Sequence, residues 1–305
     1  MPTHSHPARA KGETVLQILA ISLAVATLVL LFIGAMVTST NSGLSVPDWP
    51  STFGRNMFAY PLREMKGGIF YEHGHRLFAS AVGFLTMVLV IAAWIWEKRR
   101  WVKGLSVGAL IMVCLQGILG GLTVRHHLPI AVSSAHAGLA AVFFCTTLWL
   151  ASAASTAWKN ASAWKAQPLV YGLWGGAAFS LTQTLLGAMM RHSYAGLAIP
   201  TFPRAFGGWI PDFWSRGIFL NFLHTRVGAG VLATLCVILM VMLFRQRMRA
   251  LGLALGAVLV LQIMLGMLTI WSGKIPLMAS LHLAGGAVLL GFLFTSGLWA
   301  GKWIR

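Results

Sequence analysis

Four histidines and one glutamate are the residues of this chain whose types and spacing suggest chemistry. The chain has ten histidines among its 305 residues, and four of them stand near the start of a long apolar segment. These four are His75, His136, His224 and His282, two in each half of the chain. A single histidine on an apolar helix is usually structural, but polar residues inside a membrane are costly. Their recurrence at matched positions therefore indicates ligands.

Two facing imidazoles suit haem iron better than zinc. Zinc usually takes three or four protein ligands, often including thiolate or carboxylate, and no cysteine or second carboxylate is expected at the depth of these histidines. Haem iron takes two axial ligands and can lie between the helices of a bundle. We therefore expect one pair of histidines, and one haem, in each half of the chain.

Glu72 is the one acid close to this depth. It precedes His75 by three residues, so both side chains project from one helix face, and Arg76 follows it by four, within reach of an ion pair. The alternative is a helix-entry carboxylate that only pairs with Arg76. In the second half Asn221 stands three residues before His224. This asymmetry predicts one reactive site and one site that only holds haem or transfers electrons.

Arginines expected near the same face could bind the propionate groups of haem through charge-assisted hydrogen bonds. Each one alone could equally bind a lipid phosphate or face water. They are Arg76, Arg125, Arg191, Arg204, Arg216 and Arg226. Arg76 and Arg226, beside the histidines, are the two expected to contribute to cofactor binding. Two long loops, 39–73 and 191–217, are expected to cover the two sites.

The composition places these residues in a membrane protein. Hydrophobic residues make up 57% of the chain and charged residues 10%, with a mean hydropathy of +0.77. A helix that crosses a bilayer needs about 20 apolar residues. Eight such segments are predicted, at 15–38, 74–96, 104–124, 132–153, 167–190, 218–244, 250–271 and 277–299. The polar residues 1–13 lack a cleavage site, so the first segment is expected to be retained.

The basic residues predict the orientation in the membrane. Of the 23 lysines and arginines, 13 lie at alternate boundaries of the apolar segments: Arg9, Lys11, Lys98, Arg99, Arg100, Lys103, Lys159, Lys165, Arg245, Arg247, Arg249, Lys302 and Arg305. The positive-inside rule then puts both termini in the cytoplasm and the four histidines towards the outer face of a bacterial cytoplasmic membrane. It also accounts for the net charge of +17 without nucleic acid as a partner.

The chain is predicted to be a tandem duplication. Gly34, Gly43, Leu44, Pro47 and Pro50 recur 153 positions later, and Gln116, Leu119, Gly120, Leu122, Thr123, Ser134 and His136 recur 146 positions later. The shared glycines either allow close helix packing or leave room for a flat macrocycle. The predicted fold is all-α, with eight transmembrane helices in two tandem four-helix bundles related by a pseudo-two-fold axis. The bundles cover 1–151 and 168–305, with a cytoplasmic linker at 152–167.

Four motifs together resemble the haem A synthase family over nearly the whole chain. They are Glu72-His73-Gly74-His75-Arg76, the loop from Asn41 to Pro50, the segment from Gln116 to Val124, and Ser134-Ala135-His136-Ala137-Gly138. The resemblance implies an enzyme that oxidises a ring methyl of haem O to a formyl group, giving haem A for terminal cytochrome oxidases. It also implies that the oxygen atom of the formyl group derives from water.

The same resemblance implies roles for the histidines and partners for the protein. His75 and His136 would ligate the substrate haem, His224 and His282 would ligate a resident haem b (iron protoporphyrin IX), and Glu72 would act near the reacting methyl. Expected partners are membrane lipid, the farnesyltransferase that makes haem O, an unidentified electron acceptor and a second copy of the chain.

The chain departs from the family pattern at two places. Some members carry a cysteine pair in the first outer loop, whereas Cys114, Cys145 and Cys236 all fall inside apolar segments here. The second half also reads His224-Thr225-Arg226, with one residue inserted between the histidine and the arginine. Two alternatives are a membrane cytochrome b that only transfers electrons and a transporter built from parallel repeats. Glu72 argues against the first, and the lack of charged, broken helix centres argues against the second.

Overall fold

The computed structural model describes residues 7–162, 165 and 167–303, and within these residues the chain is helical, with two isolated β-bridges. The long helices are α1 (Pro7–Ser39), α2 (Gly68–Trp96), α3 (Arg100–Arg125), α4 (Ile130–Ala154), α6 (Pro168–His192), α8 (Ala229–Arg245), α9 (Arg249–Trp271) and α10 (Pro276–Trp303). The short elements are η1 (Met57–Ala59), η2 (Leu62–Glu64), α5 (Thr156–Asn160), η3 (Ala195–Leu197), α7 (Arg216–Phe222) and the π-helical turn η4 (Leu223–Gly228).

Each predicted apolar segment is covered by a helix, and seven segments of the described chain are long and apolar enough to cross a membrane. One of the seven, Arg216–Arg245, consists of α7, η4 and α8 in continuous succession. The segment predicted at 167–190 forms α6 but is not among the seven. Its centre carries Ser180, Thr182 and Gln183, which make it less apolar than the other long helices.

Two boundaries differ from the sequence-based expectation. The helix predicted from residue 15 is already formed at Pro7, the first residue that the structure describes. The predicted linker 152–167 is not wholly irregular, since α4 continues to Ala154 and α5 follows it. The Ser155 hydroxyl accepts a hydrogen bond from the N–H of Trp158 and caps α5.

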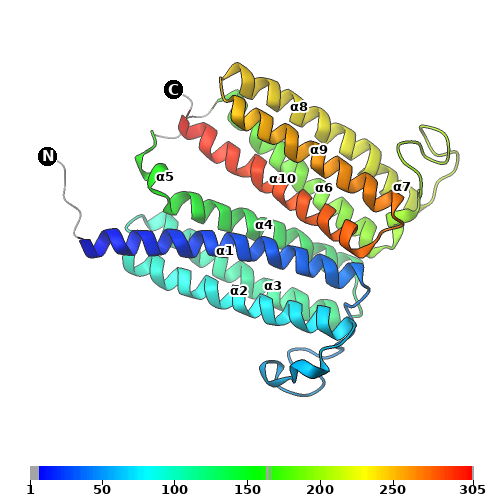
Figure 1. The fold of residues 1–305 in the computed structure, drawn as a ribbon, viewed down its shortest axis with the longest axis horizontal. Coiled ribbons are helices and arrows are strands. Elements are labelled where there is room, and N and C mark those ends of the chain that lie inside the picture. The colour runs from blue at the N-terminus through cyan, green and yellow to red at the C-terminus, as the bar shows by residue number, and fades with distance from the viewer. Residues whose placement is uncertain (1–6, 163–164, 166, 304–305) are drawn as a thin grey trace.

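The long helices pack in two groups. Helix α1 contacts α2 and α4, and α3 also contacts α2 and α4. In the same way α6 contacts α8 and α10, and α9 contacts α8 and α10. Contacts of α1 with α10, of α4 with α6 and of α4 with α10 join the groups. Figure 1 shows both groups side by side, with the start of α1 and the end of α10 at one end and the two long loops at the other.

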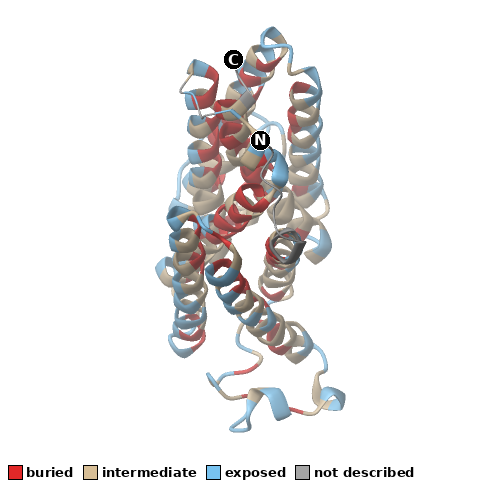
Figure 2. Ribbon diagram, turned by 90° about the vertical axis from the view of Figure 1, so that its left-hand side faces the viewer, coloured by how far each residue is buried: buried red, intermediate tan, exposed pale blue. Residues whose placement is uncertain are grey.

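Buried residues line the helix faces inside each group, as Figure 2 shows. Leu23 and Leu89 belong to the core of the first group, and Leu173 and Leu293 to the core of the second. Large apolar side chains also cover much of the outer helix surface, for example Phe84, which is 63% exposed. An outer surface of this kind matches lipid rather than water as the surrounding solvent.

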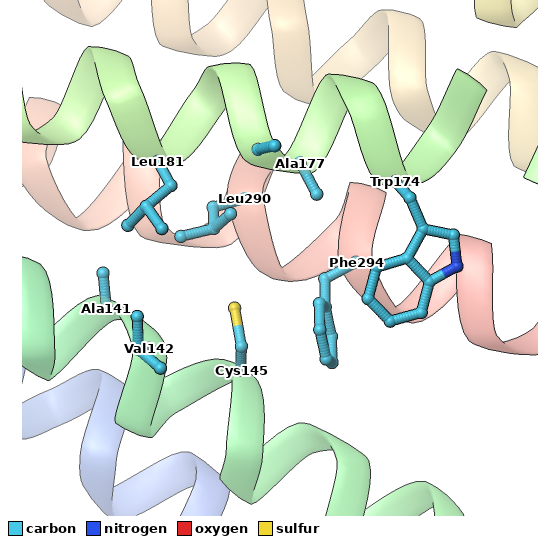
Figure 3. A pocket seen from close by; sticks show the side chains of 9 residues that line it. Ala141, Val142, Cys145, Trp174, Ala177, Leu181, Leu290 and Phe294 are labelled. Carbon is cyan, nitrogen blue, oxygen red and sulfur yellow. The ribbon is translucent and has the colours of Figure 1, made fainter. Parts of the chain in front are cut away.

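An apolar cavity of about 170 Å³ lies where α4, α6 and α10 meet. Cys145 of α4, Trp174 of α6, and Leu290 and Phe294 of α10 line it (Figure 3). Cys145 follows His136 by nine residues, about 13 Å along the helix at 1.5 Å per residue. No charged side chain lines the cavity, so it is separate from the histidines in both position and chemistry.

Asp48 organises the first long loop. Its carboxylate accepts hydrogen bonds from the Ser51 hydroxyl at 2.5 Å and from the N–H groups of Phe53 and Gly54 at 2.8 and 2.9 Å. Burial alone would raise the pKa of Asp48, but the hydrogen bonds, chiefly that from Gly54, lower it from 3.8 to about 2. The charged form therefore holds this turn.

Asp48→Asn is expected to loosen the loop at neutral pH, because the amide is a weaker acceptor than the carboxylate. Protection of the amides at residues 53 and 54 against hydrogen–deuterium exchange should fall about fivefold, as expected for roughly 1 kcal/mol. The folded-state pKa lies below the ordinary value, so the contribution is complete above pH 3.8 and is lost as the pH falls through 2. Equal protection of both proteins at pH 7 would contradict this role.

Candidate functional site

Each of the four histidines packs against a glycine of a neighbouring helix. Imidazole atoms would lie 3.0 Å from a Cβ at Gly34, 3.4 Å at Gly120, 2.8 Å at Gly187 and 3.0 Å at Gly266. The pairs are Gly34 with His75, Gly120 with His136, Gly187 with His224, and Gly266 with His282. The glycines that recur in the sequence thus leave space for imidazole rings.

All four rings have a buried nitrogen without a partner. Nδ1 of each histidine is buried and makes no hydrogen bond within the described part of the chain. Leaving a buried polar group unsatisfied costs about 1–3 kcal/mol. Four such nitrogens at matched positions indicate that a bound group forms part of the complete site.

The two histidines of the second half have the spacing that an iron between them requires. The ring centroids of His224 and His282 lie 6.4 Å apart, and the ring planes are inclined at 84°. If a nitrogen of each ring faced a shared iron, two metal–nitrogen bonds of about 2 Å, plus about 1.2 Å from each ring nitrogen to its centroid, would add up to about 6.4 Å. The donor set and its spacing therefore fit a bis-histidine haem.

Gly187→Ala is expected to reduce haem binding in the second half. The added methyl group would lie 2.8 Å from Cε1 of His224, so the ring must move away from its position opposite His282. The measurement is the haem content of the purified protein together with its low-spin absorbance. Gly175→Ala is the matched control, because a Cβ there on the same helix meets nothing within 4 Å. Equal haem content in both variants would show that the glycine has no role in placing His224.

Glu72 and Arg76 anchor the first long loop to α2. The Glu72 carboxylate lies 2.6 Å from Arg76 Nη2 and accepts the N–H of Val46 at 2.8 Å. Arg76 also donates to the backbone carbonyls of Val46, Asp48 and Ser51, at 2.8, 2.7 and 3.2 Å. Glu72 is only 3% exposed, so a buried ion pair and four backbone contacts hold the loop over the start of α2.

Asn221 and Arg226 hold the second long loop in a corresponding way. Asn221 Nδ2 donates to two loop carbonyls at 3.0 Å, and its Oδ1 accepts from Arg226 Nη1 at 3.0 Å. Arg226 Nη2 donates to the carbonyls of Thr201 and Arg204. Thr201 and Arg204 stand 153 positions after Asp48 and Ser51, whose carbonyls Arg76 contacts. The first site has an acid at the position where the second has an amide.

The π-helical turn η4 takes up the residue inserted in the second half. His224 follows His75 by 149 positions, whereas Arg226 follows Arg76 by 150. A π turn accommodates one additional residue within a helix, and η4 spans this insertion. Arg226 therefore reaches loop carbonyls equivalent to those of Arg76 although the sequence is one residue longer.

Gln183 of α6 donates to a carbonyl in this turn. The carbonyl of His224 accepts the N–H of Ala229 in the π pattern of i to i−5 hydrogen bonds and can accept a second donor. Gln183 Nε2 donates to the carbonyl of His224 at 3.2 Å. Gly228 permits this approach, because a Cβ there would lie 2.4 Å from the Gln183 amide.

Gln183 is a residue at the site that sequence reasoning missed, whereas Gln116 was noted only as part of the repeat and of a motif. Gln116 Nε2 donates to the carbonyl of His136 at 3.0 Å, so in each half a glutamine contacts the backbone of a histidine. A polar residue where the first half of the chain has an apolar one was the sequence signal for Gln183. Leu30, 153 positions earlier, is the apolar residue at the corresponding place in the half without an insertion.

Arg76 and Arg226 lie beside the histidines, but loop carbonyls engage both guanidinium groups, and their contact with propionates stays a prediction. His73 is fully buried and lies 3.1 Å from the Thr52 hydroxyl, under the first loop. No group of three or more histidine, cysteine or acidic side chains that could hold a metal ion occurs among the described residues.

Fold and site together define an all-helical, multi-pass membrane protein with paired histidines suited to haem. Residues 17–294 match the model of the COX15-CtaA family, described as cytochrome oxidase assembly protein. The chain therefore belongs to this family, and its resemblance to haem A synthases is confirmed.

Three relatives, each named Heme A synthase, illustrate the similarity. That of Shouchella clausii is 30% identical over 70% of this chain and 71% of its own length. That of Symbiobacterium thermophilum is 31% identical over 71% and 72%. That of Halalkalibacterium halodurans is 28% identical over 88% of this chain and 90% of its own.

Proposed function

We propose that this chain is a haem A synthase, an oxidoreductase that converts a ring methyl of haem O to the formyl group of haem A. The family match over residues 17–294 carries this conclusion. The two pairs of histidines support it, because the reaction calls for a protein that holds haem within the membrane. None of the observations favours a cytochrome b that only transfers electrons.

The substrate site is assigned to the first half and the cofactor site to the second. His75 and His136 would ligate haem O, and His224 and His282 would ligate haem b. The spacing of 6.4 Å between the second pair of rings supports the assignment of a resident haem there. When bound, haem b would supply reversible one-electron transfer.

Glu72 is proposed as the catalytic residue of the first half. Conversion of a methyl to a formyl group with water as the oxygen source releases four protons and four electrons; the electrons would leave to the acceptor, and a base near the methyl would take up protons. Glu72 lies on the His75 face of α2, and its Oε2 atom could accept a proton in exchange for the hydrogen bond from Val46. Asn221 at the corresponding position has no such capacity, which supports chemistry in the first half only.

The proposal includes the arrangement of the helices in the membrane and the orientation of the chain. Helix α6 would be the eighth transmembrane segment, and α1–α4 and α6–α10 would form two tandem bundles, 1–151 and 168–305, joined by a cytoplasmic linker. The pairwise contacts within each group of helices support this arrangement. The clusters of basic residues support cytoplasmic termini and haem sites near the outer face.

The protein would receive haem O from one membrane protein and pass electrons to another component of the membrane. Haem O is a substrate made by a farnesyltransferase, which we propose as the donor, and the electrons pass to an acceptor of the same membrane. A second copy of the chain is a further expected partner.

The decisive experiment is to purify the protein from cells that make haem O and to separate its extracted haems chromatographically. Haem A, or its hydroxylated precursor, beside haem b would support oxidation of the ring. Haem b together with unchanged haem O would overturn the proposed enzyme and favour an electron-transfer protein.

A further inference from the structure

Arg191, near the end of α6, crosses from one group of helices to the other. Its Nη2 donates hydrogen bonds to the carbonyl of Ala35 at 2.7 Å and to the hydroxyl of Ser39, both on α1. The Ser39 hydroxyl lies 3.0 Å from that of Ser280 on α10, which is fully buried. Arg191 therefore stands where α1, α6 and α10 meet.

The positive charge of Arg191 has no carboxylate partner in the described part of the chain. Both of its acceptors are neutral, and only Nη2 makes hydrogen bonds there, which leaves the Nε and Nη1 donors available. A charge near the hydrocarbon layer is costly without a partner of opposite sign. An anion bound beside Arg191 would lower this cost.

The position of Arg191 would put such an anion beside the second pair of histidines. Arg191 follows Gly187 by four residues, so it lies one turn further along the helix face against which His224 packs. Ser280, linked to Arg191 through Ser39, precedes His282 by two residues. The guanidinium group is therefore near the His224–His282 pair, on the side of the long loops.

The two arginines closest to the histidines in sequence are less free to bind an anion. Arg76 donates to three loop carbonyls and pairs with Glu72. Arg226 donates to the carbonyls of Thr201 and Arg204 and to the side chain of Asn221. Arg191 has more donors left than either.

We propose that Arg191 binds a propionate carboxylate of the haem that His224 and His282 hold. This inference rests on the proposed function only in taking a haem to occupy this pair. Guanidinium and carboxylate form strong, often bidentate hydrogen bonds, and the charged propionates of a haem between these helices are better placed towards the polar end of the bundle than within hydrocarbon. Arg191 would thus fix the orientation of the haem as well as its affinity.

The test compares two ligands that differ only in the propionates. The full-length His75→Ala variant, which keeps only the second pair intact, is stripped of haem and titrated with iron protoporphyrin IX or with its dimethyl ester. The low-spin absorbance of the six-coordinate iron reports binding. Adding Arg191→Gln should weaken binding of the diacid about tenfold to a hundredfold, the range for a hydrogen bond to a charged group, and should leave binding of the diester unchanged.

Two further variants keep the test decisive. Arg63→Gln removes an exposed arginine of η2 in the first long loop and should affect neither ligand. Arg191→Lys keeps the charge and should lose less affinity for the diacid than Arg191→Gln. Equal weakening of both ligands by Arg191→Gln would mean that the arginine only joins α6 to α1, and no weakening of either would mean that it does not contact the haem. Both outcomes overturn the inference. Binding is measured in the His75→Ala variant, which lacks a complete substrate site. Both outcomes are therefore independent of haem A formation.

Discussion

Glu72→Gln is expected to stop formation of haem A while the protein still folds and still holds haem b in its second half. Loss of a general base typically slows a reaction about a hundredfold or more, and the amide cannot accept a proton at pH 7. The loop should remain anchored, because the amide oxygen can still accept the N–H of Val46 and Arg76 keeps its three carbonyl acceptors. The measurement is haem extraction and chromatography from cells that make haem O.

Glu64→Gln is the matched control for this prediction. Glu64 lies in the same loop and pairs with Arg55 at 3.4 Å, but its side chain is 39% exposed. This variant should make haem A at the normal rate. Tryptic cleavage after Arg55 should be equally slow in the Glu72→Gln variant and the unmodified protein, which would show that the loop is intact. Normal production of haem A by Glu72→Gln would exclude catalysis by this carboxylate.

His224→Ala is expected to remove the haem b of the second half. The substitution would delete one of the two proposed haem ligands and leave a space where the ring packed on Gly187. Pyridine haemochrome analysis of the purified protein should show the loss of one equivalent of haem b and, because the proposed electron route is gone, little haem A.

His126→Ala tests whether the effect is specific to the histidine pair. His126 is exposed at the end of α3, so its removal should leave the haem content unchanged. His282→Ala should reproduce the loss seen for His224→Ala. If His224→Ala retained its full complement of low-spin haem b, the second pair would not be the cofactor site.

Much of the fold can be predicted from the sequence because lipid makes simple demands on a chain. Every backbone group must be satisfied internally, so each long apolar segment forms a helix, and the predicted segments 74–96 and 250–271 lie within α2 and α9. The pairing of Glu72 with Arg76 also follows from their spacing of four residues on one helix face. These features depend on local sequence alone.

The rest depends on contacts between distant segments. The spacing of Arg76 in the sequence indicates a position beside His75, but it does not reveal that the carbonyls of Asp48 and Ser51 converge on the guanidinium group. The bond from Arg191 to Ala35 joins residues 156 positions apart, and no periodicity predicts it. Sequence comparison between the halves detects the insertion before Arg226, whereas only the backbone shows that a π turn absorbs it.

That turn has a consequence for how the two halves could have diverged. Gln183 adds a second donor to the His224 carbonyl, which already accepts the N–H of Ala229 in the π pattern. Replacing Gln183 with leucine, the residue at position 30 of the first half, would therefore remove one hydrogen bond, about 1 kcal/mol, without leaving the carbonyl unpaired. Deleting the inserted residue would instead shift Arg226 along the helix relative to the loop carbonyls that it contacts. The substitution is thus the smaller step between the two halves, and the insertion is the larger one.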